Sequence, residues 1–562
     1  MRIIFLFGFL WTGWACQATP VESNGSYNNS ATELTPAEVN VLETQRQTFL
    51  AAPDLAARLE RLAELEEQAL ALVIDEPLKL GSIGSAILDL YPGSQTGHFA
   101  MSKFYARVDV LDTQAEHQAQ LTRLQTYMKG SGEGTADAPY QIMTINDAKA
   151  FSRTNGATPV GGLYQVPELT SFRLLLITRP QDTGLQSTHY DLSHVLQAFS
   201  ATHSATGEPH QGENPSPAQA QNPWSLLRTL AANMDGAAQT AIGRYLLQMQ
   251  KTEDAVNWLN AASRSGNVLA NISLARIYLR QAQTTEDTTE QAELRELAME
   301  NQLQAIALGS TDAMYTLANL YLNDFYGEDN RSAAIPLLRR AANLKHAPSL
   351  LYLGYLHNVG RELPKDVALA SAYYGQAAAL NDAKSILTYG RFLTGTDDEL
   401  PSGEQPTPIH QSLKKLAAED ESEAMVILGN LYARGITLDA SNRNAMRWYK
   451  KAAKADPTNA DIINEVAWTL SVSDIPGLKQ PKYARRIMDT LMNNNDSART
   501  KPEYLDTWAA AYAATGDFER AVQLQTEAIA IATADGRESV IDVLRKHLEL
   551  FKAGDTVTEK AP

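Results

Sequence analysis

A serine and a lysine three positions apart are the clearest candidates for covalent chemistry in this sequence. Ser412 and Lys415 have the Ser-x-x-Lys spacing, in which a lysine amine can activate a serine hydroxyl as a nucleophile. The pair lies in a segment with helical periodicity, and the companion motifs of such enzymes are missing from the sequence. We therefore interpret both residues as part of a solvated helix surface. We predict no catalytic residues and no enzymatic activity.

Histidines near residue 190 are the clearest candidates for metal binding. His189, Asp191 and His194 lie close together in the sequence, and imidazole and carboxylate groups are ligands of Zn²⁺. His203 and His210 follow, in a stretch with the composition of a linker. Because a metal site needs ligands in fixed geometry, we interpret all of these as surface and turn residues. We predict neither a metal nor a cofactor.

The charge balance and the single cysteine narrow the classes of partner. The 562 residues include 48 Lys and Arg and 65 Asp and Glu, which gives a net charge of −17. Such a chain has no excess of cations to replace the counterions of phosphate, so we expect no nucleic-acid partner. One cysteine cannot form a disulfide within the chain or a Cys-rich zinc site.

The first residues have the pattern of an export signal. Met1 and Arg2 precede an apolar stretch at 3–14 that is too short to span a bilayer, and Cys16 follows directly. This start resembles a bacterial lipoprotein signal, which implies cleavage before Cys16 and lipidation of its side chain. By the same resemblance, Gln17 favours the outer membrane, with the protein in the periplasm. Cleavage as an ordinary signal peptide, giving a soluble secreted protein, is the alternative.

Between the signal and residue 223 the composition changes several times. We expect a signal peptide at 1–16 and a flexible tether at 17–35, followed by a helical region at 36–130 whose first helix is capped by Thr35 and Glu38. Short β-rich runs around one helix predict a small α+β module at 135–200. A linker rich in Ser, Pro and Gln is expected at 201–223.

The second half of the chain repeats one pattern of small and aromatic residues. A Gly or Ala is followed by a bulky pair and then by paired Ala, as expected for antiparallel helix pairs in which a large side chain fits against a small one. The residues that carry this signature are Gly354, Tyr373, Tyr374, Ala377, Gly429, Tyr432, Trp448, Tyr449, Ala452, Trp508, Tyr512, Gly516 and Ala521.

These copies resemble Sel1-like repeats, a variant of the tetratricopeptide (TPR) family. We expect six Sel1-like units at 236–455, TPR-like repeats with a capping helix at 456–551, and a tail at 552–562. The predicted fold is mainly α, a solenoid of helix hairpins, with the small α+β module in the N-terminal half. The aromatic positions are expected to be structural.

The resemblance implies a function in binding rather than catalysis. We expect an exported, membrane-anchored scaffold that binds protein partners in the bacterial cell envelope, such as an exopolysaccharide export complex, and that meets the membrane only through its N-terminal lipid. The alternative is a ligand-binding or glycan-binding α+β module, or an enzymatic one, that the repeats present.

Overall fold

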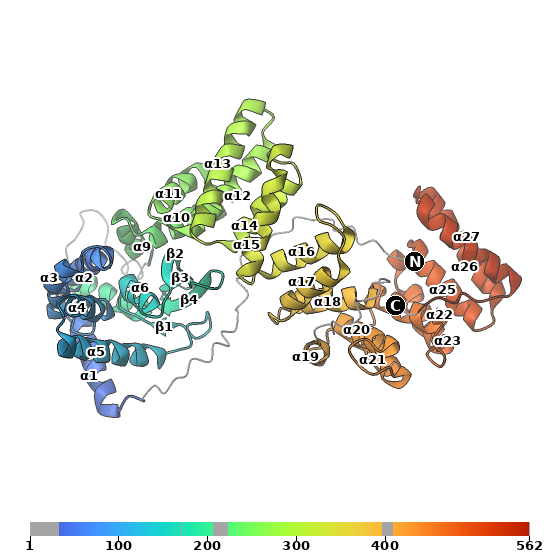
Figure 1. The fold of residues 1–562 in the computed structure, drawn as a ribbon, viewed down its shortest axis with the longest axis horizontal. Coiled ribbons are helices and arrows are strands. Elements are labelled where there is room, and N and C mark those ends of the chain that lie inside the picture. Colours follow the sequence, from blue (N-terminus) through green and yellow to red (C-terminus); the bar gives the residue numbers. More distant parts are fainter. Residues whose placement is uncertain (1–32, 169, 206–222, 396–407, 561–562) are drawn as a thin grey trace. The chain divides into compact units, whose positions relative to one another are not determined.

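The protein is described from a computed structural model that covers residues 33–168, 170–205, 223–395 and 408–560. Contacts divide the chain into two compact units, which we call the N-terminal unit, ending at Leu344, and the C-terminal unit, starting at Lys345. Helices dominate both units (Figure 1). Cys16, most of the predicted tether and most of the predicted linker lie outside the described residues.

The N-terminal unit begins with five helices. The predicted capping box is confirmed, because the Thr35 N–H donates to the Glu38 carboxylate at 3.0 Å and the Glu38 N–H donates to Thr35 Oγ1 at 3.3 Å. Each of these helices lies within the predicted helical region. They are α1 (Pro36–Leu50), α2 (Leu55–Leu72), α3 (Leu80–Leu90), α4 (Gln95–Arg107) and α5 (Leu111–Lys129).

The predicted α+β module is present as a four-stranded sheet with helices. The strand order is β1-β4-β3-β2, with β1 parallel to β4 and the other pairs antiparallel. Residues 201–205 continue α7, so the predicted linker begins too early; the helical pattern of α7 simply runs on into the polar segment. The elements are β1 (Tyr140–Gln141), α6 (Ile145–Thr154), β2 (Thr158–Gln165), β3 (Arg173–Arg179), β4 (Gln186–Asp191) and α7 (Ser193–Ala205).

Helix pairs follow the sheet within the N-terminal unit. Three pairs, α10/α11, α12/α13 and α14/α15, are the first three of the six predicted units. The helices are α9 (Pro223–Ala232), α10 (Gly236–Gln248), α11 (Thr252–Arg264), α12 (Val268–Thr284), α13 (Thr288–Ala307), α14 (Thr311–Leu322) and α15 (Ala334–Asn343).

The module is packed against these repeats and shares a core with them. Asn267, the N-cap of α12, accepts a hydrogen bond from the Leu269 N–H at 3.0 Å. Its amide donates to the carbonyl of Gly162 in β2 at 2.8 Å and to that of Gly236 at the start of α10 at 3.0 Å. A Cβ at Gly161 would lie 2.6 Å from Asn267 Oδ1, so glycine at this position lets the strand approach α12. One hydrophobic cluster accordingly runs from α2 through the sheet into α10.

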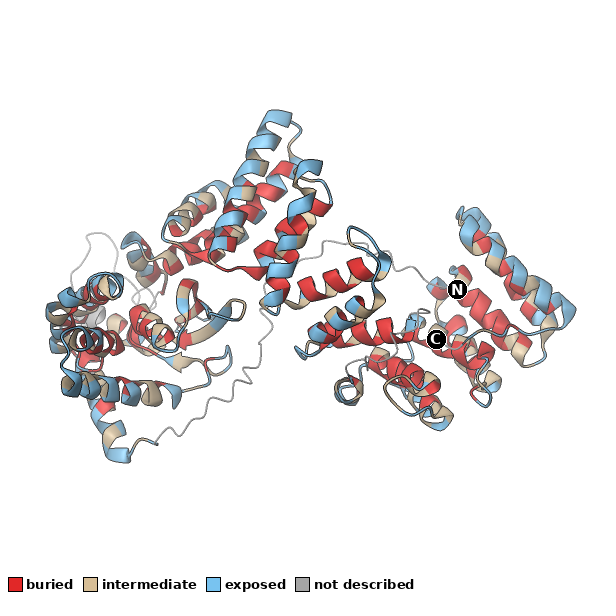
Figure 2. Ribbon diagram, in the orientation of Figure 1, coloured by how far each residue is buried: buried red, intermediate tan, exposed pale blue. Residues whose placement is uncertain are grey.

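The C-terminal unit contains the helix pairs of the other three predicted units and the helices of the predicted TPR-like region. Its buried residues lie along the helix sides that face other helices (Figure 2). The helices are α16 (Ala347–Val359), α17 (Val367–Ala378), α18 (Ala383–Gly395), α19 (His410–Ala418), α20 (Ser422–Arg434), α21 (Asn442–Ala455), α22 (Ala460–Val472), α23 (Pro481–Asn494), α24 (Asp496–Arg499), α25 (Pro502–Ala514), α26 (Phe518–Ala534) and α27 (Glu538–Ala553).

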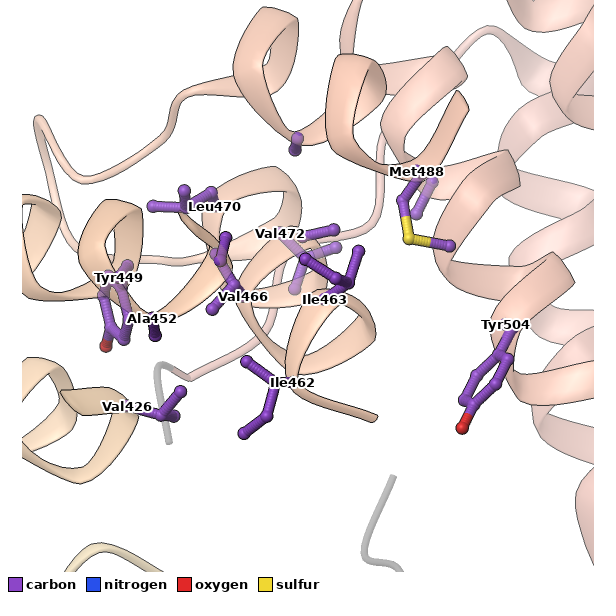
Figure 3. Packing of buried hydrophobic residues seen from close by; sticks show 14 of the residues in the cluster. Val426, Tyr449, Ala452, Ile462, Ile463, Val466, Leu470, Val472, Met488 and Tyr504 are labelled. Carbon is purple, nitrogen blue, oxygen red and sulfur yellow. The ribbon is translucent and has the colours of Figure 1, made fainter. Parts of the chain in front are cut away.

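The first helices of successive pairs form one continuous row. Each first helix contacts the next one in the row, which runs α16, α18, α20, α22, α25 and α27. Neighbouring second helices among α17, α19, α21 and α23 make few contacts with one another or none. The closely spaced row is the inner layer of a solenoid and the second helices are its outer layer. Figure 3 shows Val426, Tyr449 and Ile462, from three different helices, in the core between the layers.

Two buried carboxyl groups lie where α4 and α6 begin. Glu66 of α2 accepts hydrogen bonds from Ser94, the N-cap of α4, at 2.7 Å and from Thr144, the N-cap of α6, at 2.6 Å. Asp147 accepts from the Thr96 N–H at 3.1 Å. Burial and the nearby Asp147 raise the pKa of Glu66 well above its usual value, and burial raises the pKa of Asp147 to about 6. The pair therefore retains a proton at pH values where exposed carboxyl groups have lost theirs.

Replacing Glu66 by glutamine should weaken the pH dependence of stability. Because the folded pKa values are raised, the native state holds extra protons above the unfolded pKa, near pH 4, and stability falls as the pH rises toward and beyond 6. The amide introduced by Glu66→Gln supplies a permanent donor to Asp147, so the slope should fall by about one proton, ~1.4 kcal/mol per pH unit. Urea unfolding between pH 5 and 8 measures it. Glu67→Gln, at an exposed position of the same helix, should leave the slope unchanged; an equal effect of both substitutions would contradict the prediction.

Candidate functional site

Glycine and tyrosine from paired helices set the distance between the two layers of a repeat. A Cβ at Gly429 of α20 would overlap the ring of Tyr449 in α21, and a Cβ at Gly354 of α16 would lie 3.0 Å from the ring of Tyr374 in α17. Tyr449 is fully buried, and its hydroxyl donates to Asn430 Oδ1 at 2.8 Å. Each ring thus occupies the space that a side chain on the facing helix would need.

The other signature residues lie at or near the same interfaces. Ala377, Ala452 and Ala521 are fully buried, and Trp508 is buried with its indole N–H donating to Asp489 at 2.8 Å. The remaining positions are half-buried or terminate a helix. They are Tyr373, which stacks on His357, Tyr432, Trp448, Tyr512, whose hydroxyl also donates to Asp489, and Gly516, which follows α25 with a φ of +88°.

A family model matches the helix pairs in four places. The Sel1 repeat model matches residues 261–282, 311–346, 347–382 and 422–457. The chain contains Sel1 repeats. Proteins with these repeats generally mediate protein–protein interaction, and the repeat scaffolds are typically not enzymes.

Similar proteins include a yeast regulator and two bacterial repeat proteins. The chitin synthase regulator SKT5 of Saccharomyces cerevisiae is 29% identical over 145 residues, which are 25% of this chain and 20% of that protein; the match spans a fifth of its length. A Sel1 repeat protein from Oxalobacter formigenes is 15% identical, covering 57% of this chain and 90% of the other, with a TM-score of 0.38. The protective antigen c5321 of uropathogenic Escherichia coli, with an SLR fold, is 14% identical, with coverages of 90% and 97% and a TM-score of 0.39.

One cation of the inner layer, Arg391, is paired within the protein. Arg391 of α18 donates to Glu423 of α20 at 2.8 Å and to Glu465 of α22 at 2.5 Å. Burial lowers the pKa of Arg391, but the two carboxylates more than offset this, so its pKa is raised. This arginine links three successive first helices and is therefore engaged in holding the row together.

Seven cations of the outer layer are exposed and have no ion-pair partner among the described residues. These are the exposed cations of α21 and α23, and together we call them the basic face. They are Arg443, Arg447, Lys450, Lys451, Lys454, Lys482 and Arg486. None of them forms an ion pair with a carboxylate of the described residues. Lys450 and Arg486 lie over the ring of Tyr483, at 5.3 and 5.0 Å from its centroid, so the two helices form one surface. The run of cations is visible in the sequence, but the net charge of −17 conceals it.

A cleft of about 470 Å³ lies where the turn after β3 meets α15. Arg179 lines it from the α+β module, and Arg339 and Arg340 line it from the repeats. Arg179 donates to the Ala307 carbonyl at 2.9 Å, and the Gly184 N–H donates to the Leu344 carbonyl at 3.1 Å. The cleft is therefore a junction between the module and the repeats of the N-terminal unit, not a pocket of the module alone.

The histidine cluster is divided between a strand and a helix. His189 lies on β4, where burial lowers its pKa, and Asp191 accepts a hydrogen bond from the Ser193 N–H at 2.9 Å. His194 is on α7, and burial lowers its pKa to about 4. Within the part of the chain that the structure describes, no group of three or more potential ligands is placed to hold a metal ion.

No helix of the described residues is both long enough and apolar enough to span a bilayer.

Replacing Gly429 by alanine should destabilise the C-terminal unit by about 1–3 kcal/mol, because the new methyl group overlaps the buried Tyr449 ring. Gly395→Ala is the matched control, since a Cβ at this helical glycine meets nothing within 4 Å. Urea unfolding of both variants provides the measurement. If the two substitutions had equal effects, the ring would not be setting the spacing of the helices.

Proposed function

We propose that this protein is a scaffold of the bacterial cell envelope that binds an acidic surface of a partner protein through its basic face. The observation that carries the proposal is the contrast between the paired Arg391 and the seven cations of the basic face. Arg391 on the inner layer is held by two carboxylates, whereas the seven cations of the basic face are exposed and have no such partner among the described residues.

The positive charge of the basic face suits recognition of a protein surface. The basic face lies on two adjacent helices, so its cations keep a defined pattern that a complementary acidic surface can match. The rest of the chain carries an excess of negative charge, which repels an acidic partner from other surfaces and favours this one. Similarity over 145 residues to a chitin synthase regulator supports action on another protein rather than on a small molecule.

The proposal includes a location at the membrane. Supporting it are the short apolar stretch after Arg2 and the position of Cys16 directly behind it, which resemble a lipoprotein signal. A lipid on Cys16 and the polar residues that follow would tether the repeats at the periplasmic face of the outer membrane. Assembly of an envelope complex, such as one that exports an exopolysaccharide, is the process that such a scaffold would serve.

Reversing three charges of the basic face should remove the partner. In the variant Arg443→Glu, Arg447→Glu and Lys450→Glu, attraction to an acidic surface becomes repulsion, and we expect at least about a tenfold loss of the crosslinked partner. The measurement is crosslinking in cells, followed by co-purification and quantification.

The matched control reverses three exposed cations elsewhere in the same unit that form no ion pair with a carboxylate of the described residues, namely Lys384→Glu, Lys415→Glu and Arg520→Glu. These should leave the recovered partner unchanged. Equal loss in both variants, or retention in both, would contradict a role for the basic face. Binding to anionic lipid vesicles without a protein partner would also contradict the proposal.

Substituting Cys16 by serine should release the protein from the membrane. Serine offers no thiol for the lipid, so the variant is expected in the soluble fraction while the unchanged protein stays with the membrane. Cell fractionation together with labelling by a radioactive fatty acid measures both properties. Label on the Cys16→Ser variant, or none on the unchanged protein, would rule out the anchor.

A further inference from the structure

Residues 555–560 turn back onto an earlier repeat instead of extending α27. After α27, Gly554 adopts a left-handed φ of +79°, and the Asp555 N–H donates to the Leu550 carbonyl at 2.9 Å. The residues that follow reach the end of α22, where Glu559 forms a bridge with Ser473. We call residues 555–560 the tail.

The tail pairs with the main chain just beyond α22. The Glu559 N–H donates to the Val472 carbonyl, and the Asp474 N–H donates to the Glu559 carbonyl, both at 2.9 Å, which forms a parallel bridge opposite Ser473. Addition of an extended segment to a free edge of main chain is a common way in which proteins bind peptides. The hydrogen bonds depend on an extended backbone and not on the identity of the residues.

Glu559 and Val557 of the tail make the more buried side-chain contacts, and the exposed Thr558 hydroxyl accepts a hydrogen bond from Lys479 Nζ at 3.3 Å. The Glu559 carboxylate accepts a hydrogen bond from the indole N–H of Trp468 at 3.2 Å and lies 3.8 Å from His547 Nε2. Val557, two positions earlier, is only 4% exposed and belongs to the hydrophobic core, whereas Thr556 and Thr558 are exposed. Buried and exposed residues alternate, as in a strand with one side against a protein.

The groups that hold Glu559 are fixed by the repeats themselves. His547 Nδ1 lies 2.9 Å from Oδ1 of the buried Asp506, which also accepts from the Gln525 amide at 2.8 Å. The rings of Trp468 and His547 lie 5.7 Å apart. Trp468, Asp506 and His547 come from α22, α25 and α27, three successive first helices, so the site is built by the inner layer and not by the tail.

We propose that this surface, the tail site (Trp468, the main chain at 472–474 and His547), binds an extended segment of a partner protein in which a carboxylate residue follows an aliphatic residue by two positions. The chain's own tail has that pattern and occupies the site as a competitor. The inference goes beyond the proposed function, because it concerns a surface distinct from the basic face and can fail or succeed independently of it.

Peptide binding to a shortened chain tests the proposal. The probe is a fluorescein-labelled, amidated peptide of residues 555–560, added to the full chain and to a chain that ends at Gly554. The shortened chain should bind the peptide at least about tenfold more tightly, because the attached tail competes at an effective concentration in the millimolar range. Fluorescence anisotropy gives the two dissociation constants.

Substitutions in the peptide and in the site test the chemistry. Peptides with Glu559→Gln or Val557→Asp should each bind at least about tenfold more weakly to the shortened chain. Trp468→Phe in the shortened chain keeps an aromatic ring but removes the indole N–H, so it should weaken binding of the unchanged peptide. The difference in affinity between the unchanged peptide and the Glu559→Gln peptide should therefore be smaller for this variant.

Three outcomes would overturn the proposal: a folded shortened chain that does not bind the peptide, equal binding by both chains, or equal binding of the unchanged and Glu559→Gln peptides. Should the shortened chain fail to fold, the full chain with Glu559→Gln replaces it and must bind the unchanged peptide more tightly than the original chain does. Concentration-dependent association of full chains that truncation abolishes would assign the site to the tail of a second copy, and would overturn recognition of a different partner.

Discussion

The close approach of two helices within each repeat is the constraint on which the rest of the structure depends. At Gly429 the missing side chain is replaced by the Tyr449 ring, and at Gly354 by the Tyr374 ring. Since these contacts fix the spacing within the two pairs, they also affect how each pair stacks on its neighbours. The continuous row of first helices and the outward position of α21 and α23 both follow from this spacing.

The repeats were predictable because their determinants are local in the sequence. Gly429 and Tyr449 lie 20 positions apart and recur in the same arrangement at Gly354 and Tyr374, so spacing alone indicates the pairing. The capping box at Thr35 and Glu38 is local for the same reason. The strands of the module were recognisable from composition, although α7 continues to Ala205 within the predicted linker, because a polar composition does not by itself end a helix.

Contacts between distant segments could not be predicted. Asn267 joins β2 to α12 across 105 positions, and nothing in the sequence around either residue marks the partner. The same holds for Glu66 with Thr144 and for Trp468 with Glu559. The basic face could be predicted only in part. Its cations are evident in the sequence, but their exposure and their lack of ion-pair partners among the described residues are known only from the structure.

The tail and the basic face belong to the same unit, which bears on how a partner can displace the tail. A tail that competes at millimolar effective concentration excludes a short peptide that makes only the same contacts, unless that peptide is equally concentrated. A partner that also meets the basic face brings its own segment to a comparable local concentration, so the two surfaces acting together can overcome the competition. On this argument the tail selects against isolated segments that resemble it and admits a partner that presents both an acidic surface and the extended segment.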